Sequence, residues 1–151
     1  MVETKCGFDN SQGNGASFLV QLGPTLFVDI GFDPNFKPAD GGPPTPGIKG
    51  VQALVDTGAT ESCIDNLLAA TLNLPVMDRR QISGVGGKHF VNMYLAQIHA
   101  PGLNFTIYGS FAGVELRAGG QPHNALIGRT FLQFFTMIYE GKTGTVTISS
   151  S

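Results

Sequence analysis

Glycine and proline interrupt this chain so often that few of its segments could form a long helix. The 151 residues include 21 glycines and 9 prolines, and five of those prolines fall within residues 33–47 (DPNFKPADGGPPTPG). Between the breaks lie short apolar runs rich in β-branched residues, which is typical of strands joined by turns. We therefore predict an all-β fold, in which about nine strands are accompanied by one or two short helices.

Alternating apolar residues and turn residues locate the predicted elements. Strands are predicted within residues 16–22, 25–32, 49–58, 79–100, 103–116, 124–128 and 136–148. The segment 79–100 contains a glycine cluster and should fold as a hairpin with a supple tip, while 136–148 should form a closing hairpin. The one clear helix lies in DNLLAATLNLP (65–75), where Asp65 can act as the N-cap and Pro75 ends the helix.

The length and the composition fit one folded domain. Apolar residues make up 42% of the chain and charged residues 13%, which argues against a disordered chain and against a helical bundle with charged faces. Residues 1–15 are polar and rich in glycine and asparagine, so we expect a flexible tail there. Residues 16–151 should then form a single domain.

Charge and hydropathy exclude several classes of partner. The formal net charge is -2 and no run of Lys or Arg is present, so neither nucleic acid nor an anionic membrane is expected as a partner. No stretch approaches the ~18 apolar residues of a membrane span, and the first residues lack the features of a signal peptide. We expect a soluble intracellular protein, in the cytoplasm or another compartment, or a soluble fragment of a larger protein.

The histidines and cysteines form no metal-binding or nucleophile pattern. His89, His99 and His123 are scattered and share no ligand spacing, so we interpret them as ordinary surface or turn residues. Cys6 and Cys63 are too few for a disulfide framework, and Cys63 fits a small core position better than a catalytic nucleophile. We therefore expect no metal and no cofactor.

The stretch ALVDTGAT (53–60) places an acid, Asp56, at the end of an apolar strand. An isolated Asp-Thr-Gly is most often a turn in which the carboxylate accepts backbone N–H groups. Here, however, small Ala59 follows in place of another turn residue. About 70 residues later a second apolar pair ends in glycine, Leu126-Ile127-Gly128, and leads into a predicted helix. This combination favours a functional role for Asp56.

The sequence resembles the retropepsin-like aspartic proteases, the single-domain relatives of pepsin that are typified by retroviral proteases. The resemblance is carried by ALVDTGATESCI (53–64), QISGVGGKHFVNMYLAQI (81–98) and NALIGRTFL (124–132), in the order of the family and at roughly its spacing. These segments cover residues 48–135 well, and residues 16–32 fit the first strands of the family. The resemblance implies an acid-protease β-barrel with a glycine-rich flap hairpin.

The chemistry of such a protease needs two acids. Peptide hydrolysis by carboxylates requires one ionised acid that takes a proton from water and one protonated acid that donates to the carbonyl oxygen. Two aspartates held about 3 Å apart share one proton, as is known for aspartic proteases as a class. This chain has one Asp-Thr-Gly and no Asp-Ser-Gly, so the second acid must come from another copy.

The sequence therefore predicts a homodimeric aspartic endopeptidase that acts on an extended peptide or protein substrate. Asp56 of each subunit would activate the attacking water. The alternative is a catalytically silent module of the same fold that serves for dimerisation or peptide binding.

The resemblance also implies roles for the residues around the catalytic acid. Thr57 would donate its hydroxyl across the dimer axis, and Gly58 would let the substrate backbone approach closely. Leu126, Ile127 and Gly128 would support the catalytic turn from below. The implied substrate-binding residues, of which the last five form the flap, are Gly58, Ala59, Thr60, Ile82, Ser83, Gly84, Val85, Gly86 and Gly87.

Two features depart from the retroviral members. In those proteins the arginine equivalent to Arg129 pairs with an acid shortly after the catalytic triplet. That stretch holds Ala59 and Thr60 here, so Glu61 becomes the candidate partner of Arg129, in a structural or dimer-stabilising ion pair. The C-terminal hairpin resembles cellular and bacterial members. We expect the dimer interface to be built from this hairpin, with little part played by the N-terminal strand, unless the hairpin packs on its own subunit.

Overall fold

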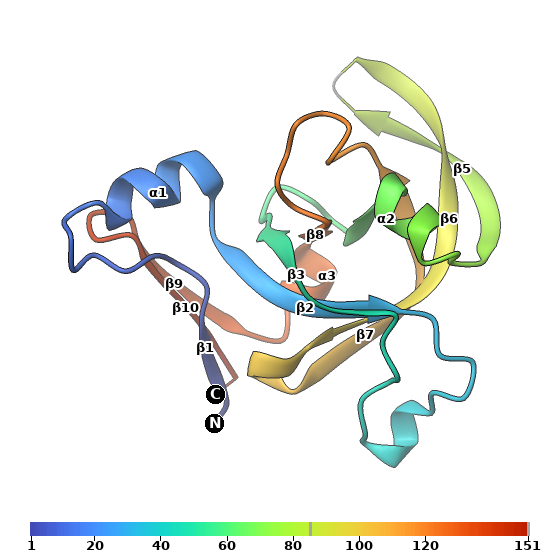
Figure 1. The fold of residues 1–151 in the computed structure, drawn as a ribbon, viewed down its shortest axis with the longest axis horizontal. Coiled ribbons are helices and arrows are strands. Elements are labelled where there is room, and N and C mark those ends of the chain that lie inside the picture. Colours follow the sequence, from blue (N-terminus) through green and yellow to red (C-terminus); the bar gives the residue numbers. More distant parts are fainter. Residues whose placement is uncertain (85, 151) are drawn as a thin grey trace.

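Two β-sheets contain all the strands of residues 1–84 and 86–150, the part of the chain that this computed structural model describes (Figure 1). The strands are β1 (Glu3–Lys5), β2 (Thr25–Gly31), β3 (Ile48–Val55), β4 (Cys63–Asp65), β5 (Val76–Gly84), β6 (Gly87–Ala100), β7 (Phe105–Val114), β8 (Ala125–Ile127), β9 (Thr136–Glu140) and β10 (Thr145–Ser149). The helices are α1 (Gly15–Leu22), α2 (Asn66–Thr71) and α3 (Arg129–Leu132), with short 3-10 turns at Pro38–Asp40 and Pro101–Leu103. The prediction of an all-β fold with few short helices is confirmed, although the described residues hold three α-helices.

The larger sheet curls into a partly closed barrel. Its strand order is β2-β3-β8-β4-β7-β6-β5, and β2 pairs in addition with β6 near the opposite end. The sheet is mixed, because β3 runs parallel to β8 and β4 runs parallel to β7. Side chains at 0% exposure fill the interior, among them Val28, Ile30, Ile98 and Ile127. This core holds β3 and β8 side by side, and the candidate acid lies at their shared end.

The smaller sheet corrects the expectation for the N-terminus. Its order is β1-β10-β9, and Glu3 pairs with Ser149. Cys6 is 2% exposed. The Cys6 N–H donates to the Val146 carbonyl oxygen at 2.9 Å. Residues 3–8 are therefore held in the fold by backbone pairing and do not form a flexible tail, whereas residues 9–14 are exposed.

The segment 16–22 is also corrected, because it forms the helix α1 and not a strand. Leu19 is buried one helical turn after buried Gly15, which is the spacing of a helix face. The helix ends at Gly23, which adopts a positive φ of 73° and donates its N–H to the Leu19 carbonyl oxygen. A short apolar run such as this one cannot be assigned to helix or strand from its periodicity alone.

The other predicted elements agree with the structure. Asp65 caps α2, since its side chain accepts the Leu68 N–H, and the helix ends before Pro75. The strands β5 and β6 form the hairpin with a glycine tip, in register up to Gly84 opposite Gly87. The C-terminal hairpin consists of β9 and β10, whose end pair is Glu140 with Thr145. Among the helices of the described residues, none has the length and apolar character needed to cross a membrane.

Candidate active site

Asp56 is the first residue after β3, directly beside the end of β8. Its N–H donates to the Ile127 carbonyl oxygen at 2.9 Å, which continues the parallel pairing of β3 with β8 by one step. The chain then turns, and the carboxylate atom Oδ1 accepts the Gly58 N–H at 2.9 Å. The side chain remains partly exposed. The turn expected of an isolated Asp-Thr-Gly is thus present, and it holds the carboxylate in one orientation at the surface.

The residues after β8 support this turn from below. Arg129 N–H donates to the Ala59 carbonyl oxygen, and Thr130 N–H donates to the Thr60 carbonyl oxygen, both at 2.9 Å. At Gly128 the approach is so close that a Cβ would lie 2.6 Å from the Glu61 carbonyl oxygen. Any larger residue at this position would push the two segments apart, which explains the glycine in Leu-Ile-Gly.

The Arg129 guanidinium contacts the same turn, but not through the acid that we expected. Its Nη1 donates to the Thr57 carbonyl oxygen at 2.7 Å, and its Nη2 donates to the Thr60 hydroxyl at 3.0 Å. Within the described part of one chain, the ion pair with Glu61 is not formed, and the one salt bridge joins Arg80 to Asp78. Two neutral acceptors lie within reach of the guanidinium, whereas Glu61 is exposed to solvent.

The second acid near this region, Asp65, is held by backbone groups and is not available for chemistry. It is 0% exposed, and its Oδ2 accepts the Leu68 N–H at 3.1 Å. Its Oδ1 accepts the N–H groups of Leu116 and Arg117, each at 3.0 Å. Asp65 therefore joins α2 to the loop that follows β7, a long-range role that its position as an N-cap did not indicate.

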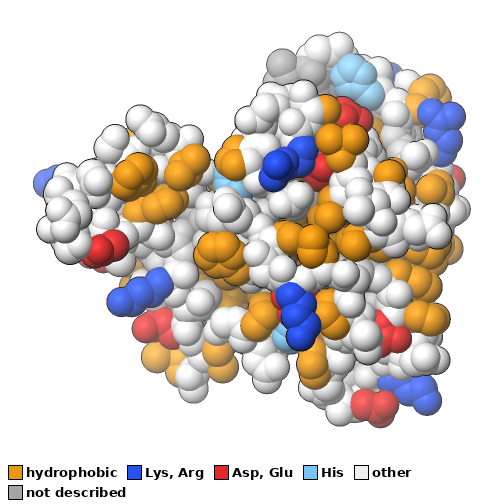
Figure 2. Space-filling model, viewed as in Figure 1, with side chains coloured by type: hydrophobic (Ala, Val, Ile, Leu, Met, Phe, Trp, Pro, Cys, Tyr) orange, Lys and Arg blue, Asp and Glu red, His pale blue; other side chains and the backbone are white. Residues whose placement is uncertain are grey.

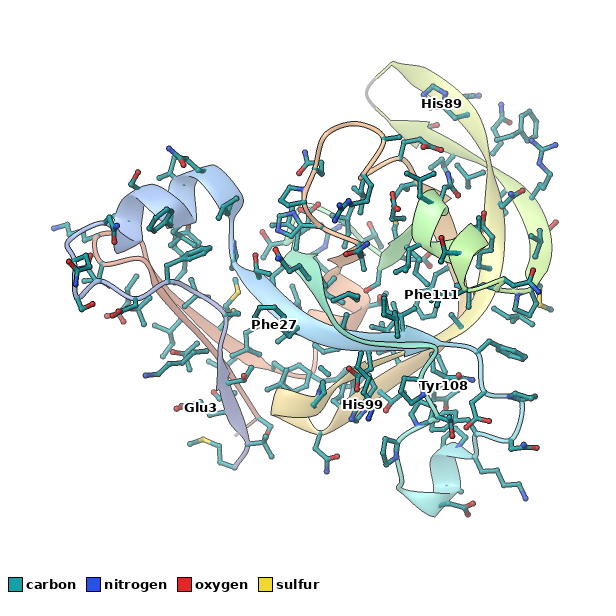
Figure 3. The ribbon with its side chains drawn as sticks, in the orientation of Figure 1. Glu3, Phe27, His89, His99, Tyr108 and Phe111 are labelled. Carbon is teal, nitrogen blue, oxygen red and sulfur yellow. The ribbon has the colours of Figure 1, made fainter. Side chains whose placement is uncertain are left out.

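The expected flap residues lie on the β5–β6 hairpin and not beside Asp56. Ile82, Ser83 and Gly84 belong to β5, and Gly87 begins β6. Val85 lies outside the described residues. In Figure 1 the hairpin tip stands well away from the end of β3, and His89, labelled in Figure 3, lies close to that tip. One chain thus brings together Asp56 to Thr60 and Leu126 to Arg129, but not the hairpin tip.

A cavity of about 660 Å³ opens between the β5–β6 hairpin and α2. No motif in the sequence predicts it. Its lining includes Ile82, Phe90, Tyr94, Asn66 and Glu115. The Tyr94 hydroxyl donates to Asn66 Oδ1 at 3.1 Å, and Asn66 Nδ2 donates to Glu115 Oε1 at 2.6 Å. A Cβ at the neighbouring Gly113 would collide with Asn66, so that glycine makes room for the polar chain.

Two of the histidines are buried, which corrects their interpretation as surface residues. His99 is 9% exposed and its Nδ1 pairs with the Thr106 hydroxyl at 2.8 Å. His123 is 2% exposed, and its Nε2 lies 3.2 Å from the Thr25 hydroxyl oxygen. Because the Thr25 hydroxyl donates to the Gly23 carbonyl oxygen, its oxygen is left to accept, so His123 carries its proton on Nε2.

The opposite nitrogen of His123 is therefore a buried acceptor. Among the described residues no group donates to Nδ1. Burial lowers the pKa of His123 from its ordinary value, since a charged ring in this position would be poorly solvated. Burial also raises the pKa of both free thiols, Cys6 and Cys63, to about 11, so neither is a reactive thiolate near neutral pH. The described residues contain no cluster of His, Cys, Asp and Glu able to hold a metal ion.

Comparison with known proteins gives one family match. A family model described as aspartyl protease matches residues 45–131, a range that includes both Asp56 and Gly128. No curated protein matches the chain. Among solved structures, the chain is similar to the EIAV protease complexed with the inhibitor HBY-793, with 21% identity over 73% of this chain and 85% of that chain and a TM-score of 0.47.

Proposed function

Because this chain belongs to the aspartyl protease family, we propose that it is a homodimeric aspartic endopeptidase whose active site is completed by a second copy of itself. The observation that supports this proposal is the arrangement of Asp56. Its backbone is fixed by β8, one carboxylate oxygen is oriented by Gly58, and the side chain remains accessible. Such a carboxylate is oriented and accessible to a substrate, but the reaction needs two acids and one chain supplies one.

The need for a second copy follows from proton transfer. One carboxylate cannot accept a proton from water and at the same time donate one to the carbonyl oxygen. Asp65 cannot serve as the second acid, because it is 0% exposed and both of its oxygens already accept backbone N–H groups. A two-fold axis beside Asp56 would supply an identical, equally accessible acid.

In the proposed reaction the two Asp56 side chains share one proton. The ionised carboxylate takes a proton from a bound water while the water oxygen attacks the scissile carbonyl carbon. The protonated carboxyl group donates its proton to the carbonyl oxygen, which gives a tetrahedral diol. When the diol collapses, the carboxyl group that took the water proton donates it to the leaving amine nitrogen, and the other carboxylate takes a proton from one hydroxyl of the diol. The C–N bond breaks, and the dyad again holds one proton.

The surrounding residues would position an extended peptide. Thr57 and Gly58 are exposed beside Asp56, so we assign the cross-axis hydroxyl to Thr57 and a close backbone contact with substrate to Gly58. Ala59 and Thr60 would line the adjacent subsites, and residues 82–87 would cover the peptide. The hairpin tip stands away from the end of β3 in its own chain, so we expect the hairpin to close over the bound peptide.

The replacement Asp56→Asn tests the proposal. We expect the variant to lose at least about 10³-fold in the rate of peptide-library cleavage, since the amide can neither accept the water proton nor share one. Asp78→Asn is the matched control, because Asp78 is 60% exposed on β5. Cleavage by Asp56→Asn at the parent rate contradicts the protease assignment. A parent chain that dimerises and binds peptides without cutting them would instead indicate the silent module.

A further inference from the structure

Most of the large apolar side chains of helix α1 are exposed to solvent. Leu19 is buried, but Phe18 is 41% exposed, Val20 82% and Leu22 39%. Figure 2 shows hydrophobic side chains gathered over this part of the molecule. A surface helix normally presents polar residues to solvent, and only two of the eight residues of GASFLVQL have polar side chains. This surface therefore has the composition of a contact face.

The C-terminal end of α1 lies next to the strand that carries Asp56. A Cβ placed on Gly23, the residue after α1, would lie 2.6 Å from Leu54 Cδ1. The carbonyl oxygen of Pro24 accepts the Val55 N–H at 2.8 Å. Since a strand rises by about 3.3 Å per residue, the end of α1 lies on the order of 10 Å from Asp56.

A two-fold axis at Asp56 brings this end of α1 into the interface. If two Asp56 carboxylates lie about 3 Å apart, the axis passes within about 2 Å of each. A stable interface of ordinary size buries about 800 Å² on each partner, which corresponds to a disc of about 16 Å radius centred on the axis. The end of α1, at about 10 Å, lies inside that disc, where apolar side chains are favoured.

We propose that α1 forms part of the homodimer interface, where Val20 and Leu22 contact the second copy of the chain beside the Asp56 pair. The proposal rests on the proposed function, because it takes a second Asp56 at the active site as given. The dimer interface would then include α1, which lies between β1 and β2 in the sequence, in addition to the expected C-terminal hairpin. It also explains why α1 carries an apolar surface that its own chain leaves uncovered.

Charge placed on α1 tests the proposal. Val20→Glu is the decisive variant, because a side chain that is 82% exposed can be replaced without disturbing the fold of one chain. We expect the dissociation constant of the dimer, measured by sedimentation velocity, to rise at least tenfold. Met77→Glu is the matched control: Met77 is 64% exposed on β5, which lies on the opposite side of the molecule from α1 in Figure 1, and the variant should leave the constant unchanged.

A second measurement separates loss of the dimer from loss of the fold. Cleavage by Val20→Glu should be lost at low protein concentration and recovered when two copies are joined in one chain by a long Gly/Ser linker. If Val20→Glu and Leu22→Glu dimerise like the parent while parental cleavage still depends on Asp56, the α1 proposal is wrong and the proposed function stands. If the parent neither dimerises nor cleaves, the proposed function fails, and the assignment of α1 fails with it.

Discussion

Arg129 holds the turn that carries Asp56 through two neutral acceptors, the Thr57 carbonyl oxygen and the Thr60 hydroxyl. A guanidinium can reach both at once because its donors lie in a rigid fork, whereas a lysine ammonium is a single point charge on a flexible stem. The geometry of the turn therefore depends on arginine and not on positive charge alone.

We predict that Arg129→Lys lowers kcat/KM for peptide cleavage by about 10- to 100-fold, since a displacement of about 1 Å at a reacting group can cost that much. Thr60→Val should have a smaller effect in the same direction, and Thr60→Ser should restore the parent value. Arg80→Lys is the control, because Arg80 is in an exposed ion pair of little energetic weight. Parent-like activity in Arg129→Lys would show that the fork is not needed.

His123 makes stability depend on pH. Its pKa in the folded chain lies below the ordinary value of 6.5, so the unfolded chain binds more protons as the pH falls. The free energy of unfolding should therefore be fully maintained above about pH 6.5 and decrease as the pH falls below that value.

We predict that urea unfolding between pH 7 and pH 5 shows this decrease for the parent, and that His123→Gln reduces it. The glutamine amide can still donate to the Thr25 hydroxyl but does not titrate. His89→Gln is the matched control for replacing a histidine by glutamine, since His89 is exposed on the hairpin. Equal slopes for parent and His123→Gln would mean that protonation of His123 costs no stability.

At the scale of elements, the N-terminal segment contributes to stability although its composition suggests a tail. Cys6 and Phe8 donate backbone hydrogen bonds to Val146 and Gly144, and the Cys6 carbonyl oxygen accepts the Thr25 N–H. These bonds join the small sheet to β2 and to the turn before β10. We predict that removing residues 1–9 lowers the thermal midpoint by at least about 5 °C.

The midpoint is measured by circular dichroism at fixed protein concentration, and the control removes only Met1, which is 89% exposed. An unchanged midpoint after removal of residues 1–9 would show that the segment adds no stability.

The elements predicted correctly from the sequence are those whose ends are marked by capping or turn residues. The helix α2 has a capping aspartate at Asp65 and a proline beyond its end, and the β5–β6 hairpin has glycines at its tip. The helix α1 could not be distinguished from a strand, because Leu19 becomes buried only when α1 packs against the small sheet. The strand β4 has three residues, too few for alternation to be visible.

At the candidate site, too, features marked by a local motif were predicted, and features that depend on contacts between distant residues were not. The family resemblance identified from ALVDTGATESCI and NALIGRTFL is confirmed by the aspartyl protease match. The partner of Arg129 could not be predicted, because it depends on which oxygens of the turn face β8. The burial of His123 depends on contact with Thr25, which is 98 residues away in the chain.

At the scale of the whole molecule, we predict that activity belongs to the pair of chains. Mixing the parent with an equal amount of Asp56→Asn chains should lower parental activity to about half once subunits exchange, because random pairing puts half of the parent chains into mixed dimers with one carboxylate. The measurement is the cleavage rate against time after mixing, and an equal amount of albumin is the control. A rate that Asp56→Asn leaves unchanged would contradict a shared active site.

The pairing of β1 with β10 has a consequence for how the chain is made. Glu3 pairs with Ser149, and both ends of the chain lie together in Figure 1. Chains are synthesised from the N-terminus at about 5–20 residues per second, so β1 leaves the ribosome first and must wait for its partner strand. The small sheet can form only after β10 has been synthesised. Until then the backbone groups of β1 lack their partners, so this sheet forms later than the strands of the larger sheet become available.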